Sequence, residues 1–415
     1  MSHGTSAAEL RERLVAQVLA TSGVRDERIA AALRDVPRHL FLPHLPPETA
    51  YLDDAIVTKR DAGGQPISSS SQPAIMAIML DQLALAAGQR VLEIGAGTGY
   101  NAALVRHIVG PSGAVYSVDI EPDLVEAARE HLASAGYPDV TVVAADGAGG
   151  YPPGAPYDRV IATVGVSDLA PAWLYQVGPG ARIVVPLDVR GSQLSVAFGR
   201  SGSGRHWVSR SITPCGFMRM RGALAGPERT VVLQPGLSIM LPDGLTLADG
   251  QEVDGAALGA FLDGPPAESA TGVRTSSLQV FWGLGLWLAA GDRRSCGVAE
   301  QRPPGDGPGR LARAPLGGDE MAATAGIVDS GGIAVLTADR PEPGRLALGV
   351  AGFGPHGSEL GAALAAHVRA WDRAGQPGAA RLHVDAYPRS SPDEPALGDA
   401  LIIERPATRF VVYHK

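Results

Sequence analysis

The most unusual polar segment of the chain is a run of four serines, Ser68 to Ser71, in the stretch PISSSSQP. Serine runs are commonly flexible linkers, an interpretation that predicts unpatterned polar flanks. The flanks here are patterned, because Gln72 and Pro73 lead into the apolar segment PAIMAIMLDQLAL at 73–85. Proline is favoured in the first turn of a helix, so we expect a helix start here with Ser71 close to its N-cap. Hydroxyls, backbone N–H groups and the positive end of a helix dipole together suit an anion such as a carboxylate.

A second segment that could do chemistry is VLEIGAGTGY at 91–100, where an apolar strand pattern runs into a glycine-rich turn. The three glycines allow the backbone to approach a ligand closely. Their spacing is G-x-G-x-G, which differs from the G-x-G-x-x-G of dinucleotide-binding folds. Glu93 stands just before the turn. An acidic group there suits a ligand with a cationic amino-acid end better than it suits a pyrophosphate.

Acidic residues also end the next two predicted strands. Asp119 comes 20 residues after Gly99, where a carboxylate can hold ribose hydroxyls at the switch point of a doubly wound sheet. Asp146 and Gly147 follow the third strand, at the height expected for an adenine ring. The pattern predicts S-adenosylmethionine (SAM) as the cofactor and S-adenosylhomocysteine (SAH) as its product; a nicotinamide cofactor, or acids that merely cap helices, are the alternatives. The candidate cofactor-binding residues are Glu93, Gly95, Ala96, Gly97, Thr98, Gly99, Asn101, Asp119, Ile120, Asp146, Gly147 and Thr163.

The elements that must position these residues alternate regularly from Arg90 onward. Strands are predicted at 90–95, 114–120, 140–146, 157–164 and 178–187, with helices at 100–109, 122–136 and 170–177. This alternation predicts an α/β fold with a doubly wound, mostly parallel, Rossmann-like sheet. Further strands are expected at 194–200, 206–212 and 215–220. Before the alternation, residues 7–34 are predicted to be one helix and residues 50–64 a loop.

A break at 222–229 predicts two domains: a catalytic domain at 1–225, with its SAM core at about 74–190, and an α+β accessory domain at 230–415. The segment VFWGLGLWL at 280–288 is predicted to be a buried strand pair, with a groove for a peptide as the alternative. The other elements expected in this domain are strands at 230–234, 332–338 and 381–387, an amphipathic helix at 357–375 and a Pro/Gly-rich loop at 301–320.

Composition excludes several classes of function. The chain has 415 residues and a net charge of −8, so its charge does not favour nucleic acids or anionic membranes. Cys215 and Cys296 form neither a zinc signature nor a disulfide framework, and the histidines show no metal-ligand spacing. The N-terminal segment lacks the apolar core of a signal peptide, and no apolar run is long enough to cross a bilayer. We therefore expect a cytoplasmic protein without metal, nucleic-acid or membrane partners; nothing in the sequence indicates an oligomeric state.

Residues from about 30 to 222 resemble the protein-L-isoaspartate O-methyltransferases. The resemblance rests on the blocks VPRHLFLP, AYLDDA, GQPISSSSQPAIMAIML, VLEIGAGTGYNAAL, SVDIEPDLVEAARE, VAADGAGG, APYDRVIAT and GPGARIVVPL, which stand in that family's order and spacing. It implies the fold of a class I SAM-dependent methyltransferase with an N-terminal helical segment. It also implies methyl transfer from SAM to an isoaspartyl or side-chain carboxylate of a peptide.

The resemblance also implies where the acceptor binds. The family's substrate-binding serine aligns with Ser68 or with Ser71, depending on which flank anchors the alignment, because this chain has three extra residues in the loop. A carboxylate is already ionised at pH 7 and needs no general base, so the serines would position it rather than attack. The candidate acceptor-positioning residues are, in order, Ser71, Ser70, Ser68 and Ser69. The candidate substrate-binding residues are Asp53, Asp54, Phe217 and Met218, with exposed loop acids and core packing as the respective alternatives.

Two features depart from the repair enzymes of this family: the longer serine loop, and the additional chain after residue 222. Such long forms resemble methyltransferases found beside ribosomally made peptides of the lanthipeptide and graspetide types. The main hypothesis is therefore methylation of an Asp carboxylate in a modified, macrocyclic precursor peptide, followed by collapse of the ester to aspartimide or isoaspartate. The accessory domain would then seat the precursor. General isoaspartyl repair is one alternative, and a non-catalytic SAM-binding regulator is another.

Overall fold

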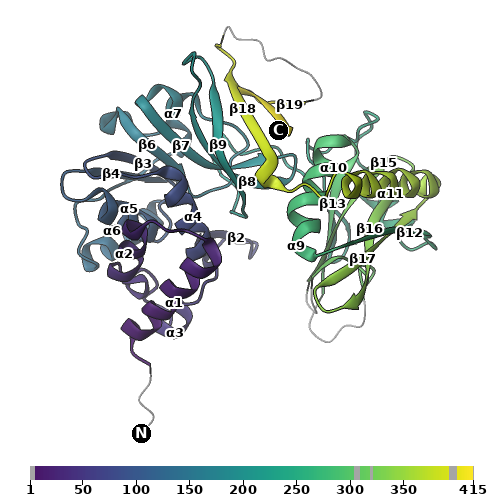
Figure 1. The fold of residues 1–415 in the computed structure, drawn as a ribbon, viewed down its shortest axis with the longest axis horizontal. Coiled ribbons are helices and arrows are strands. Elements are labelled where there is room, and N and C mark those ends of the chain that lie inside the picture. Colours follow the sequence, from purple (N-terminus) through teal and green to yellow (C-terminus); the bar gives the residue numbers. More distant parts are fainter. Residues whose placement is uncertain (1–4, 303–308, 318–320, 392–399, 415) are drawn as a thin grey trace.

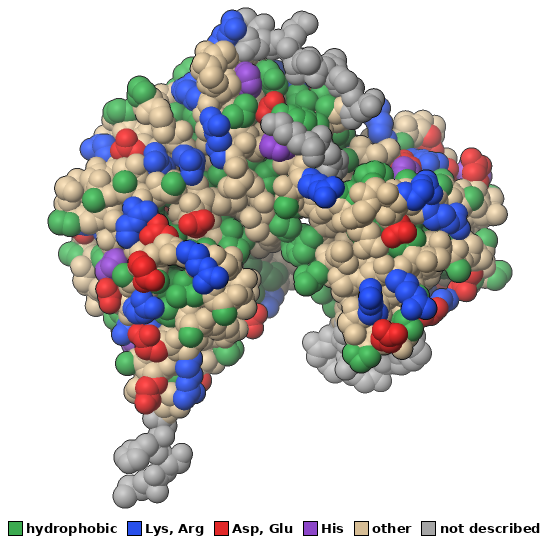
Figure 2. All heavy atoms as spheres, viewed as in Figure 1, with side chains coloured by type: hydrophobic (Ala, Val, Ile, Leu, Met, Phe, Trp, Pro, Cys, Tyr) green, Lys and Arg blue, Asp and Glu red, His purple; other side chains and the backbone are tan. Residues whose placement is uncertain are grey.

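The structure is a computed structural model that describes residues 5–302, 309–317, 321–391 and 400–414. It has two lobes, each built around its own β-sheet (Figure 1). Figure 2 shows a hollow between them. The first lobe holds the N-terminal helices and the larger sheet. The second, residues 230–381, is called the accessory lobe below.

The helices at the N-terminus are α1 (Ala7–Ser22), α2 (Glu27–Asp35), η1 (Arg38–Phe41) and α3 (Pro47–Ala50). The single helix expected over 7–34 is wrong. Gly23 adopts a left-handed conformation that ends α1, and Asp26 caps a new helix through the N–H of Arg28. The apolar spacing continues through both helices, which is why periodicity alone did not reveal the break.

The sheet of the first lobe confirms the expected Rossmann-like architecture. Its parallel strands are β3 (Arg90–Ile94), β4 (Ala114–Asp119), β5 (Thr141–Ala144), β6 (Tyr157–Ala162) and β7 (Val177–Val189), and the antiparallel strands β8 (Ser192–Arg200) and β9 (Trp207–Pro214) follow. The helices of this lobe are α4 (Pro73–Leu83), α5 (Tyr100–Val109), α6 (Pro122–Ser134) and α7 (Pro171–Tyr175), with short turns η2 (Gly147–Gly149) and η3 (Pro152–Gly154). The strand order is β5-β4-β3-β6-β7. Successive strands are added on one side of β3 up to β5 and on its other side from β6, so the order reverses between β3 and β6. Ligands of such sheets bind outside the carboxyl ends of the strands at this reversal.

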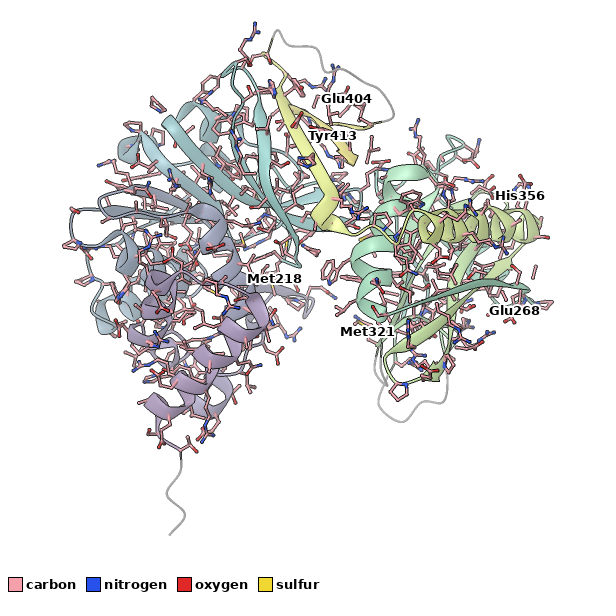
Figure 3. All side chains as sticks on the ribbon, in the orientation of Figure 1. Met218, Glu268, Met321, His356, Glu404 and Tyr413 are labelled. Atoms are coloured by element: carbon pink, nitrogen blue, oxygen red, sulfur yellow. The ribbon has the colours of Figure 1, made fainter. Side chains whose placement is uncertain are left out.

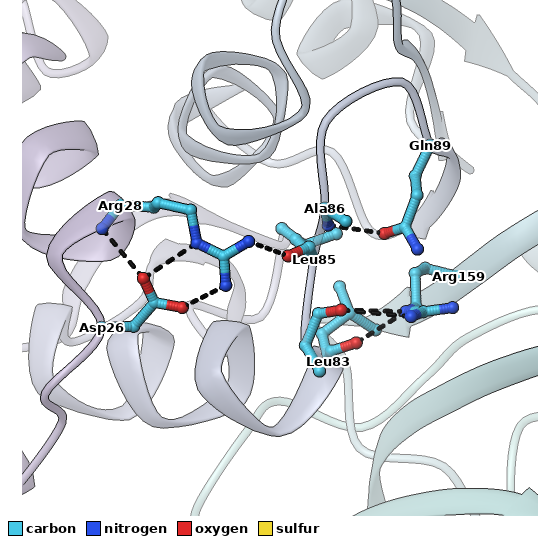
Figure 4. A network of polar contacts seen from close by, with 8 residues as sticks. Asp26, Arg28, Leu83, Leu85, Ala86, Gln89 and Arg159 are labelled. Atoms are coloured by element: carbon cyan, nitrogen blue, oxygen red, sulfur yellow. Dashed lines mark hydrogen bonds and ion pairs between the residues drawn. The ribbon is translucent and has the colours of Figure 1, made fainter.

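Helix α4, which follows the serines, is held at both ends. Arg159 donates a hydrogen bond of 2.8 Å to the carbonyl of Leu83, the last residue of the helix, and Arg28 donates one of 2.6 Å to the carbonyl of Leu85 just after it (Figure 4). At its other end, Asp53 Oδ1 accepts a hydrogen bond of 2.9 Å from the N–H of Ala74. Cations at the C-terminus and an anion at the N-terminus both complement the helix dipole. The start of α4 is therefore fixed against the sheet and the N-terminal helices.

The serine run itself is mostly strand. β1 (Ile56–Arg60) and β2 (Pro66–Ser70) form an antiparallel pair, so residues 50–64 are not all loop as expected. The N-cap of α4 is Gln72, so Ser71 stands next to the N-cap, as expected, and is not itself the capping residue. β-Branched residues in both segments favour an extended chain, and the serine pattern obscured that preference.

The strand expected at 215–220 is also absent from this described part of the chain. The segment forms a single bridge, in which Gly165 donates to the carbonyl of Met218 and accepts from the N–H of Met220, both at 2.8 Å. This bridge lies just beyond the carboxyl end of β6, outside the named strands. The apolar alternation of 215–220 therefore does not place the segment in the sheet.

The accessory lobe contains an antiparallel sheet, ordered β10-β11-β13-β15-β16-β17-β12 among the described residues. Its strands are β10 (Thr230–Gln234), β11 (Leu237–Met240), β12 (Ala267–Thr275), β13 (Ser295–Gln301), β14 (Leu316–Gly317), β15 (Met321–Asp329), β16 (Gly332–Glu342) and β17 (Arg345–Phe353), and its helices include α8 (Gly255–Phe261) and α11 (Gly357–Arg373). Helix α11 confirms the amphipathic helix expected at 357–375. Residues 303–308 and 318–320 of the expected loop lie outside the described residues. None of the described helices combines the length and apolar character needed to span a membrane.

The strand pair expected at 280–288 is wrong, because this segment is helical. It comprises α9 (Ser277–Gln279), the π-helical η4 (Val280–Leu284) and α10 (Gly285–Gly291). Ser276 starts the helix with a capping box. Val280, Leu284 and Leu288 are buried at intervals of four residues, the spacing of one helix face. A short apolar run rich in aromatic residues is compatible with a strand or a helix by pattern alone, and here tertiary packing selects the helix.

The last strands of the chain belong to the first lobe. They are β18 (Leu382–Pro388), β19 (Leu401–Glu404) and β20 (Thr408–His414). β18 pairs with β9, with Ala386 opposite Trp207, and the buried carboxylate of Asp168 accepts a 2.7 Å hydrogen bond from the N–H of Ala407. The expected domain boundary at 230–415 therefore needs correction: the accessory lobe is inserted between β9 and β18. The turn η5 (Ala379–Arg381) leads into β18.

Arg190, in the turn between β7 and β8, joins the two lobes. Its buried guanidinium donates a 2.5 Å hydrogen bond to the carbonyl of Ala289, near the end of α10, and pairs with Asp243 at 3.0 Å. Arg229 pairs with Asp188 at 2.7 Å beside it. A cation at the C-terminal carbonyls of a helix is favourable, so α10 is held against the first lobe.

This topology predicts different outcomes for two deletions. A chain that ends at residue 229 loses β18, β19 and β20, so it exposes the edge of β9 and the buried Trp207. We expect it to aggregate or to melt more than about 10 °C below the full chain. Replacing 231–381 by a flexible linker of about 12 residues should keep the sheet and SAH binding. Thermal unfolding and calorimetric SAH titration measure both; equal stability of the two deletions would contradict the assignment of the last strands.

Candidate active site

A pocket opens at the carboxyl ends of β3, β4 and β6, where the strand order reverses. The space within it, including the part that is open to solvent, is about 850 Å³. Three walls surround it: the glycine turn with the ends of β4 and β6, the serine strand at 67–71, and the segment 218–221. The expected site residues that line it are Ser68, Ser69, Ser70, Ser71, Gly95, Ala96, Gly97, Thr98, Asn101, Asp119, Ile120, Gly147, Thr163 and Met218.

The glycine turn needs its glycines for conformation and for space. Gly95, Gly97 and Gly99 have φ angles of 99°, 51° and 87°, in the left-handed region that other residues avoid. A Cβ on Gly95 would lie 2.8 Å from Oγ1 of Thr163. That hydroxyl donates to the carbonyl of Gly95 at 2.6 Å, so the end of β6 closes onto the turn.

Asp119 ties the glycine turn to the end of β4. Its Oδ2 accepts a 2.9 Å hydrogen bond from the N–H of Gly97, and its Oδ1 accepts one of 3.1 Å from the N–H of Glu121. A carboxylate has about four acceptor positions, so it keeps capacity for hydroxyl groups of a ligand. It ends the second parallel strand, the position for which the sequence predicts a ribose contact.

Glu93 lies beneath the pocket rather than in its wall. It is fully buried, and it accepts hydrogen bonds from Asn101 Nδ2 at 2.7 Å and Ser117 Oγ at 2.5 Å. Burial raises the pKa of Glu93 to about 7, opposed by those two hydrogen bonds. Glu93 therefore acts on a ligand through Asn101, which lines the pocket and whose Oδ1 has no partner among the described residues.

The serine strand faces the glycine turn across the pocket. A Cβ on Gly97 would lie 3.5 Å from the carbonyl oxygen of Ser69. Ser68 accepts a 3.1 Å hydrogen bond from the hydroxyl of Thr58 on β1. The hydroxyl of Ser70 is buried and lacks a hydrogen-bond partner in the described structure. Ser71, half-buried, follows the strand at the pocket wall.

The two expected substrate-binding acids do not line the pocket. Asp53 caps α4 through Ala74, as described above, and Gln72 donates to its backbone carbonyl at 3.1 Å. Asp54 is exposed, and its carbonyl accepts from the buried Arg38 at 3.2 Å. The geometry therefore gives Asp53 a role in placing the helix after the serines.

The segment at 215–223 contributes Met218 to the pocket but not Phe217. Met218 lies in the first lobe beside the hollow between the lobes (Figure 3). Phe217 packs against the core, and its N–H donates to Gln193 Oε1 at 2.6 Å. Asp146, expected near an adenine ring together with Gly147, does not line the pocket, whereas Gly147 does; Asp146 Oδ2 accepts from the N–H of Ala223 at 2.7 Å.

Sequence reasoning missed the cations of this wall. Arg219 and Arg221 line the pocket together with Met220. The alternation of apolar and basic residues in FMRMR was visible, but the segment was predicted to be a strand whose site residues were Phe217 and Met218. Gly99 lies at the start of α5 and does not line the pocket, although its neighbours do.

The residues present fit SAM. A buried polar atom at the pocket, Asn101 Oδ1, has no partner in the described part of the chain and so can bond this ligand. The narrow gap between Gly97 and Ser69 would be filled by any larger residue at 97. Asp119 stands where ribose hydroxyls bind in doubly wound sheets. Together the fold and the pocket define a class I SAM-dependent methyltransferase.

Comparison with known proteins defines the family. The family model for protein-L-isoaspartate(D-aspartate) O-methyltransferase matches residues 9–221. The protein-L-isoaspartate O-methyltransferase of Methanopyrus kandleri is 41% identical over 184 residues, which cover 44% of this chain and 79% of the relative. That of Hyperthermus butylicus is 37% identical over 222 residues, covering 52% and 89%. The chain therefore belongs to the protein-L-isoaspartate O-methyltransferase family.

Among solved structures, a protein-L-isoaspartate O-methyltransferase aligns with 90% of this chain and 96% of its own, at 23% identity and a TM-score of 0.49. Family membership makes this chain a SAM-dependent carboxyl O-methyltransferase whose acceptor is a protein or peptide. Bound SAM supplies an electrophilic methyl group on a positively charged sulfur. The rest of the chemistry falls to the residues that hold the acceptor and exclude water.

The buried Glu93 predicts a pH effect on stability. Its folded pKa of about 7 lies above its ordinary value of 4.5, so between these values the folded state binds more protons than the unfolded state. Stability should fall as pH rises through this window, and the loss should persist above it. Glu93→Gln should flatten the decline between about pH 5 and pH 8. Urea unfolding at several pH values measures the slopes, with the exposed Glu126→Gln as control; identical slopes in wild type and Glu93→Gln would contradict the prediction.

Proposed function

We propose that this enzyme methylates the carboxylate of L-isoaspartyl residues in proteins and peptides. The two relatives described above, in which the aligned region covers 79% and 89% of the relative's length, are named for this acceptor. The observation that carries the proposal is the serine strand beside the cofactor pocket, with the hydroxyl of Ser70 buried and unpartnered in the described structure. An anionic acceptor there would satisfy that hydroxyl.

The pocket suits an acceptor that is already a nucleophile. Among the described residues that line it there is no histidine, lysine or cysteine. A carboxylate is ionised at neutral pH, so it needs no general base. It must be held in line with the methyl group and stripped of water, and such positioning can lower the barrier by several kcal/mol, up to about 7–11 at ideal alignment. The guanidinium groups of Arg219 and Arg221, in the wall formed by 218–221, favour an anion in the same space.

The ester formed in this way is activated for a second step. The backbone nitrogen of the following residue attacks the ester carbonyl, a C–N bond forms, and methanol leaves with the nitrogen's proton. The product is a five-membered succinimide, which water opens to aspartate or isoaspartate. This step needs no residue of the enzyme.

We propose Ser70 and Ser71 as the residues that hold the acceptor. The sequence favours Ser71, whereas the unpartnered hydroxyl favours Ser70. The hydroxyl of Ser68 already accepts a hydrogen bond from Thr58, so it contributes to the pairing of β1 with β2. Within β2 the side chain of Ser69 projects from the face opposite that of Ser70, because side chains alternate along a strand; Ser71 lies beyond the end of β2.

Removing the Ser70 hydroxyl should slow methyl transfer without loss of the cofactor. We expect Ser70→Ala to lower kcat/KM for an isoaspartyl peptide roughly tenfold, since one positioning donor is lost. Affinity for SAH should stay within about twofold. The exposed Ser134→Ala, at the end of α6, is the matched control. An unchanged kcat/KM for Ser70→Ala, together with a drop for Ser71→Ala, would move the role to Ser71.

A second candidate function is tailoring of a ribosomally made peptide, in which an Asp carboxylate of a lanthipeptide or graspetide precursor is methylated and collapses to aspartimide. Two observations favour it: the lengthened serine segment, and an accessory lobe inserted beside the edge of the sheet that holds the pocket. That lobe exposes apolar side chains on its helical side, with Leu278 69% and Phe281 48% exposed. These exposed apolar side chains offer a contact surface to the parts of a longer peptide that extend beyond the methylated residue.

One experiment separates these functions. The enzyme with labelled SAM is offered a linear isoaspartyl peptide and a cyclised candidate precursor, and mass spectrometry follows methyl gain and later loss of water. Rapid methylation of the linear peptide would support the isoaspartyl proposal. Methylation of the precursor alone, followed by imide formation, would support tailoring. SAH binding without methyl transfer to any acceptor would leave the non-catalytic regulator. We also propose a cytoplasmic location, since Cys215 and Cys296 are both free thiols.

A further inference from the structure

Glu121 contacts elements from two walls of the pocket other than its own. It follows Asp119 and Ile120 at the end of β4 and stands at the N-cap of α6, yet its side chain does not cap that helix. Instead its Oε2 accepts from Lys59 Nζ at 2.5 Å, and its Oε1 accepts from Arg221 Nη1 at 2.5 Å. Lys59 lies on β1, the partner of the serine strand, and Arg221 lines the pocket.

We propose that Glu121 is a positioning residue that holds the serine strand and the segment 218–221 against the glycine turn, and so sets the affinity of the pocket for its adenosyl ligand. The contacts form a continuous chain. Asp119 fixes the backbone N–H groups of both Gly97 and Glu121. Glu121 in turn fixes Lys59, which lies opposite Ser68 in the strand register.

The β1–β2 hairpin depends on this clasp, defined as Lys59, Glu121 and Arg221, for its place over the pocket. The hairpin is a two-stranded sheet of its own, and its two strands pair with no other strand of the described chain. Isolated two-stranded ribbons are marginal without outside contacts. Lys59 adds a second anchor on α6, at 2.7 Å from the carboxylate of Asp123.

The clasp is suited to positioning rather than to stabilising the whole fold. The side chains of Lys59 and Glu121 are about a quarter exposed, and ion pairs at such sites add little to the stability of a folded protein. Hydrogen bonds from Lys59 and then from Arg221 hold the pKa of Glu121 below its ordinary value. The carboxylate is therefore charged at neutral pH, when the enzyme has to bind its cofactor.

The test is calorimetric titration of the full-length protein with SAH, which needs no acceptor. Glu121→Gln keeps the side-chain shape and removes the charge. We expect its dissociation constant for SAH to rise roughly fivefold, the size of a favourable ion-pair interaction, while the melting temperature moves by less than about 2 °C. Lys59→Met should weaken SAH binding as well. The double variant should lose less than the sum of the two single losses, because the two residues share one contact.

Salt supplies a readout that a purely structural role would not move. Raising NaCl from about 0.05 M to about 0.5 M should weaken SAH binding to the wild type and leave Glu121→Gln nearly unchanged. The exposed Glu126→Gln on the same helix should behave as wild type. Lys59→Arg keeps the positive charge that Lys59→Met removes, so its affinity for SAH should match that of the wild type. Unchanged SAH affinity in Glu121→Gln, an equal loss in Glu126→Gln, or additive losses in the double variant would each overturn the proposal. None of these results depends on whether the acceptor is isoaspartyl.

Discussion

The carboxylate of Asp119 is the point on which the rest of the site depends. It accepts two backbone N–H groups, one from the glycine turn and one from the residue that starts α6. Left unpaired in this nearly buried position, each N–H would cost about 1–3 kcal/mol. One side chain therefore fixes the turn, the end of β4 and the start of α6 together. The remaining walls are placed relative to that unit.

The strands β18, β19 and β20 return the chain to the sheet of the first lobe, so the accessory lobe is attached to that lobe at two points. Both of its connections, at about 229 and 382, lead to the sheet of the first lobe, on β9 and β18. An insertion with two attachments has less freedom than a domain on one linker. Arg190 and the pair Arg229–Asp188 add buried charged contacts at the junction. β7 ends at the same edge of the sheet as the pocket, so the accessory lobe is anchored close to the site.

The site relies on geometry rather than on proton transfer. Its acceptor is an anion, and the pocket offers it hydroxyls and two guanidinium groups. The titratable group with the largest role, Glu93, is buried beneath the wall and holds Asn101. This division separates residues that touch a ligand from residues that orient them. Relatives in the family share the first-lobe segment, whereas the accessory lobe lies outside the matched residues 9–221.

Much of the site was predictable because its residues are local in sequence. The glycine turn, Asp119 and the serine run each belong to one short segment, and the topology of a parallel sheet brings strand ends to one edge. The helix at 280–288 and the strand at 66–70 were mistaken because short segments fit more than one element until packing selects one. The cations at 219 and 221 were missed because their wall has no regular secondary structure.

The sequence by itself determined the class of fold and the cofactor, and it singled out the serine segment that lines the pocket, since local spacing specifies strand, turn and helix. Only the tertiary structure decided which serine hydroxyl is left unpartnered, that Asp53 caps a helix and that Glu93 lies beneath the pocket. It alone placed β18 beside β9 and Glu121 between Lys59 and Arg221. The physical reason is the same in each case. Hydrogen bonds and ion pairs between residues far apart in the chain depend on how the segments pack, and no local pattern encodes that packing.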